Sequence, residues 1–166
     1  MHVRIGFAAL GACSILVSAG SAHAEAHRQR GIAPPPYYYG ICKGLTKTEF
    51  VASTTNVFTS STSFVDVPDS GFSIVTAKPG CVAITITGEA STSSGTAIEM
   101  RPLLGNNSCP PSTVDFATDE PVYRTHTMTY ICNGVPAGIH DVTMQYRSDT
   151  GNMVYLNHRI VTVSHR

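Results

Sequence analysis

The sequence predicts an all-β protein, a two-sheet β-sandwich of about eight to nine strands, with a jelly roll as the favoured arrangement. Short runs of alternating or β-branched residues recur from Glu49 onward, separated by clusters of Gly, Pro, Asn and Ser. No segment keeps a helical period over about three turns. Only 13% of the residues are charged, which suits strands better than charged surface helices. An immunoglobulin-like sandwich is the second choice, because the chain has no tryptophan to pack on that fold's core disulfide.

The first 24 residues have the features of a secretory signal peptide. Residues 1–4 carry one positive charge, residues 5–20 are nearly all apolar or small, and Ala22 and Ala24 provide small side chains before a cleavage point. We therefore predict that residues 1–24 are removed and that the protein is secreted or periplasmic. The alternative is a lipoprotein, because the run 10–13 resembles a lipobox that ends in Cys13. No later stretch is long and apolar enough for a membrane span, which takes about 20 residues.

Residues 25–47 are predicted to form a linker that is rich in Pro and Tyr. Three prolines at 34–36 favour an extended polyproline segment just before three tyrosines at 37–39. A semi-rigid spacer is favoured over an aromatic docking peptide for this segment. The β-sandwich domain then occupies residues 48–166.

The strands of this domain follow from the hydrophobic pattern. The predicted strands are 50–58, 64–67, 72–76, 82–88, 96–104, 114–116, 125–132, 140–147 and 153–163. Alternation places one set of side chains on the core face, since successive side chains of a strand point to opposite sides. The predicted core set is Val82, Ile84, Ile86, Ile98, Met100, His140, Val142, Met144 and Tyr146.

The mature chain keeps an even number of cysteines, Cys42, Cys81, Cys109 and Cys132, which predicts two disulfides in an oxidising compartment. Of the three ways to pair them, we favour Cys109 with Cys132 and Cys42 with Cys81. Cys109 lies in a turn-rich loop and Cys132 ends a predicted strand. No two of these cysteines have the close spacing of a zinc site.

Candidate chemistry rests on three histidines, which the strand pattern places beside apolar residues. His126, His140 and His158 could form a metal site or supply a base if their strands were adjacent. We favour half-buried histidines with backbone or neighbouring partners, because no H-x-H or H-E-x-x-H spacing is present. The chain also lacks the G-x-S-x-G of serine hydrolases. We therefore expect no catalytic residue, metal or cofactor.

Charge and surface pattern limit the choice of partner. Eleven Lys and Arg balance eleven Asp and Glu, so no strong field marks the chain for nucleic acid. Two strands expose alternating polar side chains, Thr125, Thr127 and Thr129 on one and Thr143, Gln145 and Arg147 on the other. Such a flat face could bind carbohydrate or a partner protein, although an ordinary solvated face is favoured.

Two stretches carry a resemblance to a known group of folds. Residues 78–90 have a Pro-Gly followed by an alternating strand, and residues 136–147 contain G-x-H-x-V-x-x-Q. Over about residues 50–164, the chain resembles bacterial and phage-borne jelly-roll domains similar to the complement globular head and tumour necrosis factor family. The resemblance implies a non-enzymatic binding or adhesion head, often trimeric, although this chain has no collagen-like repeat and no long stalk.

These observations lead to one favoured function and two alternatives. The favoured one is a secreted or periplasmic module for surface binding or adhesion, with an unknown protein or carbohydrate ligand and with homo-oligomers as an option. The first alternative is a small secreted hydrolase or metal-dependent enzyme that uses His126, His140 or His158. The second is a structural component of an envelope or virion.

Overall fold

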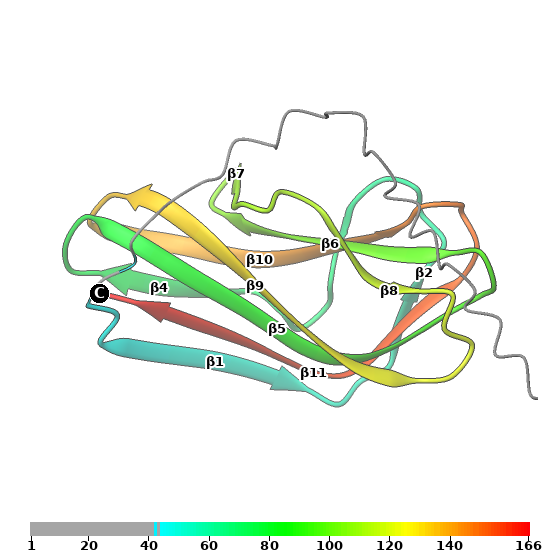
Figure 1. The fold of residues 1–166 in the computed structure, drawn as a ribbon. Coiled ribbons are helices and arrows are strands. Elements are labelled where there is room, and N and C mark those ends of the chain that lie inside the picture. The colour runs from blue at the N-terminus through cyan, green and yellow to red at the C-terminus, as the bar shows by residue number, and fades with distance from the viewer. Residues whose placement is uncertain (1–41, 43) are drawn as a thin grey trace, which may run out of the picture. The chain divides into compact units, whose positions relative to one another are not determined.

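The computed structural model describes residue 42 and residues 44–166, and this part of the chain is built from strands without a helix (Figure 1). The strands are β1 (Lys47–Ser53), β2 (Val57–Thr59), β3 (Val65–Asp66), β4 (Phe72–Thr76), β5 (Gly80–Thr92), β6 (Ala97–Leu104), β7 (Asn107–Ser108), β8 (Val114–Thr118), β9 (Arg124–Val135), β10 (Gly138–Ser148) and β11 (Val154–His165). The predicted signal peptide, and the predicted linker up to residue 41, lie outside the described residues.

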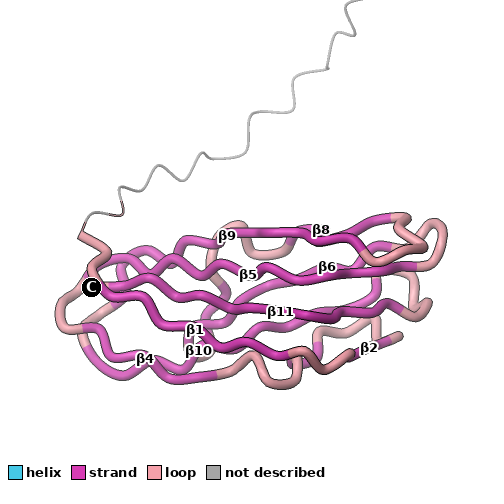
Figure 2. The backbone as a smooth tube through the Cα atoms, turned by 90° about the horizontal axis from the view of Figure 1, so that it is seen from below, coloured by secondary structure: helices cyan, strands magenta, loops and turns pink. Residues whose placement is uncertain are grey.

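The strands form two antiparallel sheets that pack as a sandwich, which confirms the predicted fold class. Sheet A has the order β1-β11-β5-β9, and β2 also pairs with β11. Sheet B has the order β3-β10-β6-β7, with β4 beside β10 and β8 beside β6. The strands of both sheets run along the length of the sandwich (Figure 2). The first and last strands are neighbours, since Lys47 pairs with His165 at the C-terminal end of the chain.

The core lies between the sheets and is made by the alternation that the sequence shows. Within β5, Val82, Ile84 and Ile86 are fully buried, and the residues between them face outward. Burial of each such side chain contributes about 1.5–3 kcal/mol to stability. The predicted core residues of β6 and β10 are buried in the same way, except that His140 is half-buried.

The predicted strand 50–58 is divided in the structure. Residues 54–56 separate β1 from β2, although both strands pair with β11. The division lies opposite an irregularity in β11, where the register with β5 shifts between Asn157 and Ile160. The sequence prediction also missed β7 and gave too short a span for β5.

The irregularity in β11 inverts the predicted orientation of one histidine. His158 has a φ of +36°, and its side chain is exposed, whereas the alternation from Val154 and Leu156 predicted a core-facing position. A β-bulge adds one residue to a strand and so reverses the parity beyond it. The prediction for His158 was therefore wrong, and Arg159 takes the inward position instead.

Arg159 is only 1% exposed, and backbone carbonyls of two loops surround its guanidinium group. Its Nη2 donates to the Pro68 carbonyl oxygen at 2.6 Å and its Nη1 to that of Thr55 at 2.5 Å. Desolvation lowers the pKa of Arg159, and the nearby Asp69 carboxylate partly offsets this effect. The buried cation therefore holds the β1–β2 and β3–β4 connections against the edge of the sandwich.

Two tyrosines connect the sheets through the core, one from each side. The Tyr130 hydroxyl of sheet A donates to the Met100 carbonyl oxygen of sheet B at 3.0 Å. The Tyr146 hydroxyl of sheet B donates to the Phe58 carbonyl oxygen of sheet A at 2.9 Å. Burial raises the pKa of both phenols, since the charged phenolate is poorly solvated in the core.

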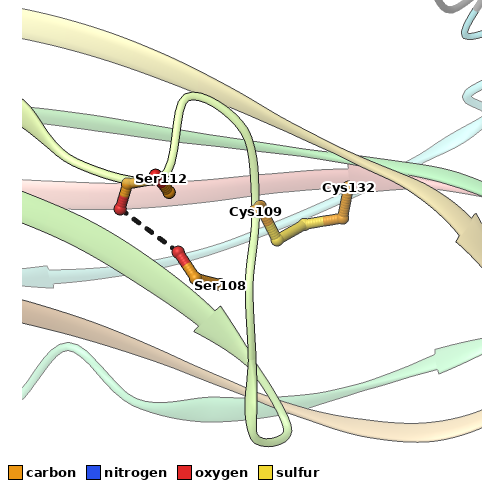
Figure 3. The surroundings of a disulfide bond; sticks show 4 residues. All are labelled: Ser108, Cys109, Ser112 and Cys132. Carbon is orange, nitrogen blue, oxygen red and sulfur yellow. Dashed lines mark hydrogen bonds between the residues drawn. A yellow bond between two sulfur atoms is a disulfide. The ribbon is translucent and has the colours of Figure 1, made fainter. Parts of the chain in front are cut away.

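Both favoured disulfides are present, with Cα–Cα separations of 5.6 Å for Cys42–Cys81 and 4.7 Å for Cys109–Cys132. The second one joins the segment after β7, in sheet B, to β9 in sheet A (Figure 3). Two disulfides fit an extracellular or other oxidising compartment. Within residues 42 and 44–166, no helix is suited to crossing a membrane.

Candidate binding surface

The side chains of sheet A that point away from the core form a face of low charge, here called outer face A. Its members are Thr48, Phe50, Ala52, Phe58, Ala83, Thr85, Thr87, Glu89, Thr125, Thr127, Thr129, Ile131, Tyr155, Ile160, Thr162 and Ser164. The strand register arranges them in rows across the sheet. One such row runs from Phe50 through Thr162 and Thr85 to Thr129.

The hydroxyl groups of outer face A hydrogen-bond to one another across the strands. Thr85 meets Thr129 at 2.9 Å between hydroxyl oxygens, and Thr87 meets Thr127 at the same distance. The sequence identified the threonines of β9 but not their partners on β5. A hydroxyl that already has a partner in the protein loses less when water is removed from it. These pairs therefore lower the cost of covering the β5–β9 side of the face.

Aromatic and aliphatic side chains lie beside the threonine pairs, on β1, β2 and β11. Phe50 is 71% exposed and Phe58 61% exposed, and the Phe58 ring lies 6.2 Å from that of Tyr155 between centroids. Ile160, next to Thr87 in the register, is also exposed. Large exposed apolar groups gathered on one face of a protein mark an interaction surface. The sequence alone does not reveal this feature, because Phe, Tyr and Ile favour strands on buried and exposed faces alike.

Near the start of β9, a tyrosine extends across the sheet. Tyr123, which precedes β9, donates its hydroxyl to Asn56 Oδ1 at 3.3 Å. Asn56 lies between β1 and β2, so two strands, β11 and β5, separate it from β9 in the sheet. The exposed Tyr123 side chain therefore adds a third ring to the end of outer face A that holds Phe58 and Tyr155.

One ion pair lies among the described residues of outer face A and its bulge. His158 Nδ1 and Glu89 Oε2 are 2.8 Å apart, and both side chains are more than one-third exposed. An exposed pair of this kind contributes about 0–1 kcal/mol. The rest of the face is neutral over the strands given above.

The corresponding face of sheet B, outer face B, is charged. The Arg101 guanidinium lies 4.0 Å from the centre of the Phe64 ring, and that of Arg147 lies 4.7 Å from it. Arg101 Nε donates to Gln145, and the Gln145 amide donates to Asp66 Oδ1 at 2.8 Å. Two carboxylates complete the set: Glu99 pairs with Arg147, and Asp141 accepts from Ser73.

The three histidines considered for chemistry have separate partners. His126 Nε2 lies 2.6 Å from Glu120 Oε2, His140 Nε2 donates to the Pro136 carbonyl oxygen at 2.9 Å, and His158 pairs with Glu89. Half-burial with a neighbouring partner matches the favoured interpretation of His126 and His140. Within the described part of the chain, no group of three or more His, Cys, Asp or Glu side chains could hold a metal ion.

Comparisons with known proteins support the fold. No protein-family model matches the chain, and no curated protein matches it. The structure is similar to VP2 in the subviral particle of infectious bursal disease virus, at 12% identity and a TM-score of 0.51 over 72% of this chain and 32% of that chain. It thus spans about a third of that protein's length.

A second similar structure is the CBM36-1 domain of a multidomain xylanase from the hindgut metagenome of Trinervitermes trinervoides. That match has 12% identity and a TM-score of 0.44, and it covers 72% of this chain and 98% of that chain. The likeness to VP2 agrees with a jelly-roll type of sandwich. The finer resemblance to the complement and tumour necrosis factor heads stays a prediction.

Proposed function

We propose that the chain is a secreted or periplasmic, non-enzymatic binding module that assembles with further copies of itself through outer face A. The observation that carries the proposal is the contrast between the two outer faces of one sandwich. Outer face B pairs its charges with one another, and its exposed apolar residues Val75 and Ile139 lie opposite each other on β4 and β10. Outer face A exposes phenyl rings on β1 and β2, paired hydroxyls on β5 and β9, and little charge.

The composition of outer face A suits contact with protein. The centres of protein interfaces are poor in charged residues and rich in aromatic ones. A buried aromatic side chain removes a large apolar area from water, at about 25 cal/mol for each Å². Phe50, Phe58 and Ile160 supply such area without a polar group that would need a new partner.

A second copy of the chain is the partner that these features favour. It offers a surface of the same low charge, and symmetric contacts between like surfaces are the common route to oligomers. Without Arg4 the mature chain has ten Lys and Arg against eleven Asp and Glu, so its formal net charge is −1 and the overall repulsion between two copies is weak. A carbohydrate ligand is less favoured on this face, because the threonine hydroxyls of β5 and β9 are already paired.

The test is the solution mass of the mature, oxidised protein by light scattering on a sizing column. We expect an oligomer for the natural sequence and a monomer for the double variant Phe50→Thr with Phe58→Thr. The matched control is Ile139→Thr, because Ile139 is 75% exposed on outer face B. A monomer for the natural sequence at all concentrations would refute self-assembly, as would an oligomer unaffected by the double variant.

Secretion and the absence of catalysis belong to the same proposal. The two disulfides support an oxidising compartment, and the separate partners of His126, His140 and His158 favour binding over acid–base chemistry. The mass of the mature N-terminus distinguishes cleavage after residue 24 from lipidation at Cys13. Assembly into closed particles rather than small oligomers would instead favour the structural envelope or virion component.

A further inference from the structure

A hollow of about 360 Å³ lies at the end of the sandwich that is distant from the aromatic rings of outer face A. It is bounded by the β6–β7 turn, by the Cys109–Cys132 disulfide and by the β9–β10 turn. Tyr123 and Phe58 adjoin the opposite end of sheet A, beside the start of β9. The volume of the hollow is at the lower end of the range for small-molecule sites, which is roughly 300–1,000 Å³.

The walls of the hollow are fixed to both sheets. Backbone hydrogen bonds join Gly105 N to the Asp141 carbonyl oxygen of sheet B at 2.7 Å, and Ile131 N of sheet A to that of Pro110 at 2.8 Å. The disulfide adds a covalent link between the same two regions (Figure 3). Walls held in this way lose little conformational freedom when a ligand binds, which favours affinity.

Glycines allow the two turns to take their shapes. Gly105 has a φ of +59° and Gly134 a φ of +67°, in the left-handed region where a side chain would be strained. A Cβ at either glycine would meet no heavy atom within 4 Å, so the backbone conformation alone requires glycine. The turns therefore present their flanking asparagines in defined positions.

The lining of the hollow combines apolar surface with polar groups and has no acidic, Lys or Arg side chain. Amide side chains come from Asn106 and Asn107 in one wall and from Asn133 in the other. None of the thirteen described lining residues is Asp, Glu, Lys or Arg. Amides both donate and accept hydrogen bonds, and Leu104 and Val135 add apolar surface beside them.

His140 adds a further polar group to the lining. Its Nε2 donates to the Pro136 carbonyl oxygen, so in the neutral ring Nδ1 is an acceptor. An ionic ligand would find no opposite charge among these side chains, and a purely apolar one would leave the amides without partners. A neutral sugar matches the lining, because its hydroxyls donate and accept while its C–H groups contact apolar surface.

We propose that this hollow is a binding site for a neutral sugar of one or two residues, held by Asn107 and Asn133 beside the disulfide. The site lies apart from outer face A and does not depend on self-assembly. It would give the module a ligand at one end while outer face A joins the copies.

The test is titration of the mature, oxidised protein with glucose, galactose, mannose and N-acetylglucosamine, followed by the backbone amide signals in NMR spectra. We expect saturable shifts from at least one sugar at residues 105–108 and 133–135, at concentrations up to about 50 mM. Asn107→Ala and Asn133→Ala should each weaken binding about tenfold, the loss of one hydrogen bond to a ligand.

Two controls make the result specific. Ser94→Ala, in the exposed β5–β6 turn, should leave the sugar affinity unchanged. Phe50→Thr with Phe58→Thr should also leave it unchanged, so failure of self-assembly and failure of the sugar site are distinguishable. Absence of saturable shifts with all four sugars would overturn the proposal, and so would unchanged affinity in both asparagine variants.

Discussion

Both outer faces of the sandwich are formed by antiparallel strands, but they differ in charge and in the side chains that cover their aromatic rings. On outer face B, Arg101 and Arg147 lie over Phe64 and cover much of an aromatic ring with charged groups. On outer face A, Phe50 and Phe58 have no such cover. Both faces therefore expose apolar side chains, since Val75 and Ile139 are exposed on outer face B, but the exposed aromatic rings of the two faces differ in their charged cover. On outer face B, charged side chains cover the Phe64 ring. On outer face A, uncharged neighbours such as threonine leave the phenyl rings exposed and available for contact with a partner.

The largest loss in the free energy of unfolding of the monomer should come from removing the Cys109–Cys132 disulfide, which links the two sheets. Replacing Cys109 and Cys132 by serine opens a covalent loop with a sequence separation of 23. We expect the free energy of unfolding to fall by about 3 kcal/mol, since a disulfide mainly restricts the unfolded chain. Urea titration of the double variant beside the natural protein measures the loss. An unchanged unfolding midpoint would show that the sheets are held together without this bond.

The second prediction compares the loss in free energy of unfolding on replacing a buried arginine with the loss on replacing a partly exposed one. Arg159→Met should lower the free energy of unfolding by about 2 kcal/mol, because carbonyl oxygens of two loops lose their donor. Arg147→Met, on outer face B, should cost less than about 1 kcal/mol, because its ion pair with Glu99 is partly exposed. Thermal unfolding of both variants checks the order. Equal losses of free energy in the two variants would contradict the conclusion that the bulge in β11 places Arg159 in a buried, stabilising position.

A smaller effect is expected for the tyrosines. Tyr130→Phe should cost about 1 kcal/mol through loss of the hydrogen bond to Met100. Tyr155→Phe, on outer face A, should change the free energy of unfolding of the monomer by less than about 0.5 kcal/mol. The same measurement as a function of pH adds a second readout for Tyr130, because burial raises the pKa of its phenol.

Burial raises the pKa of Tyr130 above its ordinary value, so the folded protein keeps this phenol neutral where the unfolded chain ionises it. The stabilisation is complete below about pH 10, the ordinary tyrosine pKa, and is lost as the pH rises above that value. Tyr130→Phe should therefore flatten the alkaline decline in stability. A decline in Tyr130→Phe as steep as that of the natural protein would contradict the burial of this phenol between the sheets.

The sequence predicted the elements that follow from alternation. β4 agrees with its predicted residues, and the inward set of β5 and β6 is the one expected, because a strand with one buried face must alternate. Both disulfide pairings were also favoured from the positions of the cysteines in loops and strands. Strand alternation is a local pattern, and four cysteines can be paired in only three ways, so both features could be predicted from the sequence.

The features that the sequence did not predict depend on the register between distant strands. The bulge at His158 shows in the sequence only as a change of parity between Leu156 and Val161, yet it decides that Arg159 is buried and His158 exposed. Thr85 and Thr87 alternate with the predicted core residues, but only pairing with β9 brings their hydroxyls to Thr129 and Thr127. The exposure of Phe58 follows from its pairing with Tyr155 on β11. Outer face A could therefore be identified only in part before the fold was known.

The most direct test of the role of outer face A is hydroxyl-radical footprinting of the mature protein at low and high protein concentration. Phe50, Phe58 and Ile139 have similar exposure in the monomer, at 71%, 61% and 75%, so one sample contains its own control. We predict that oxidation of Phe50 and Phe58 falls as the concentration rises while that of Ile139 stays constant. Oxidation of all three residues that does not depend on concentration, or protection of Ile139 alone, would contradict the proposal.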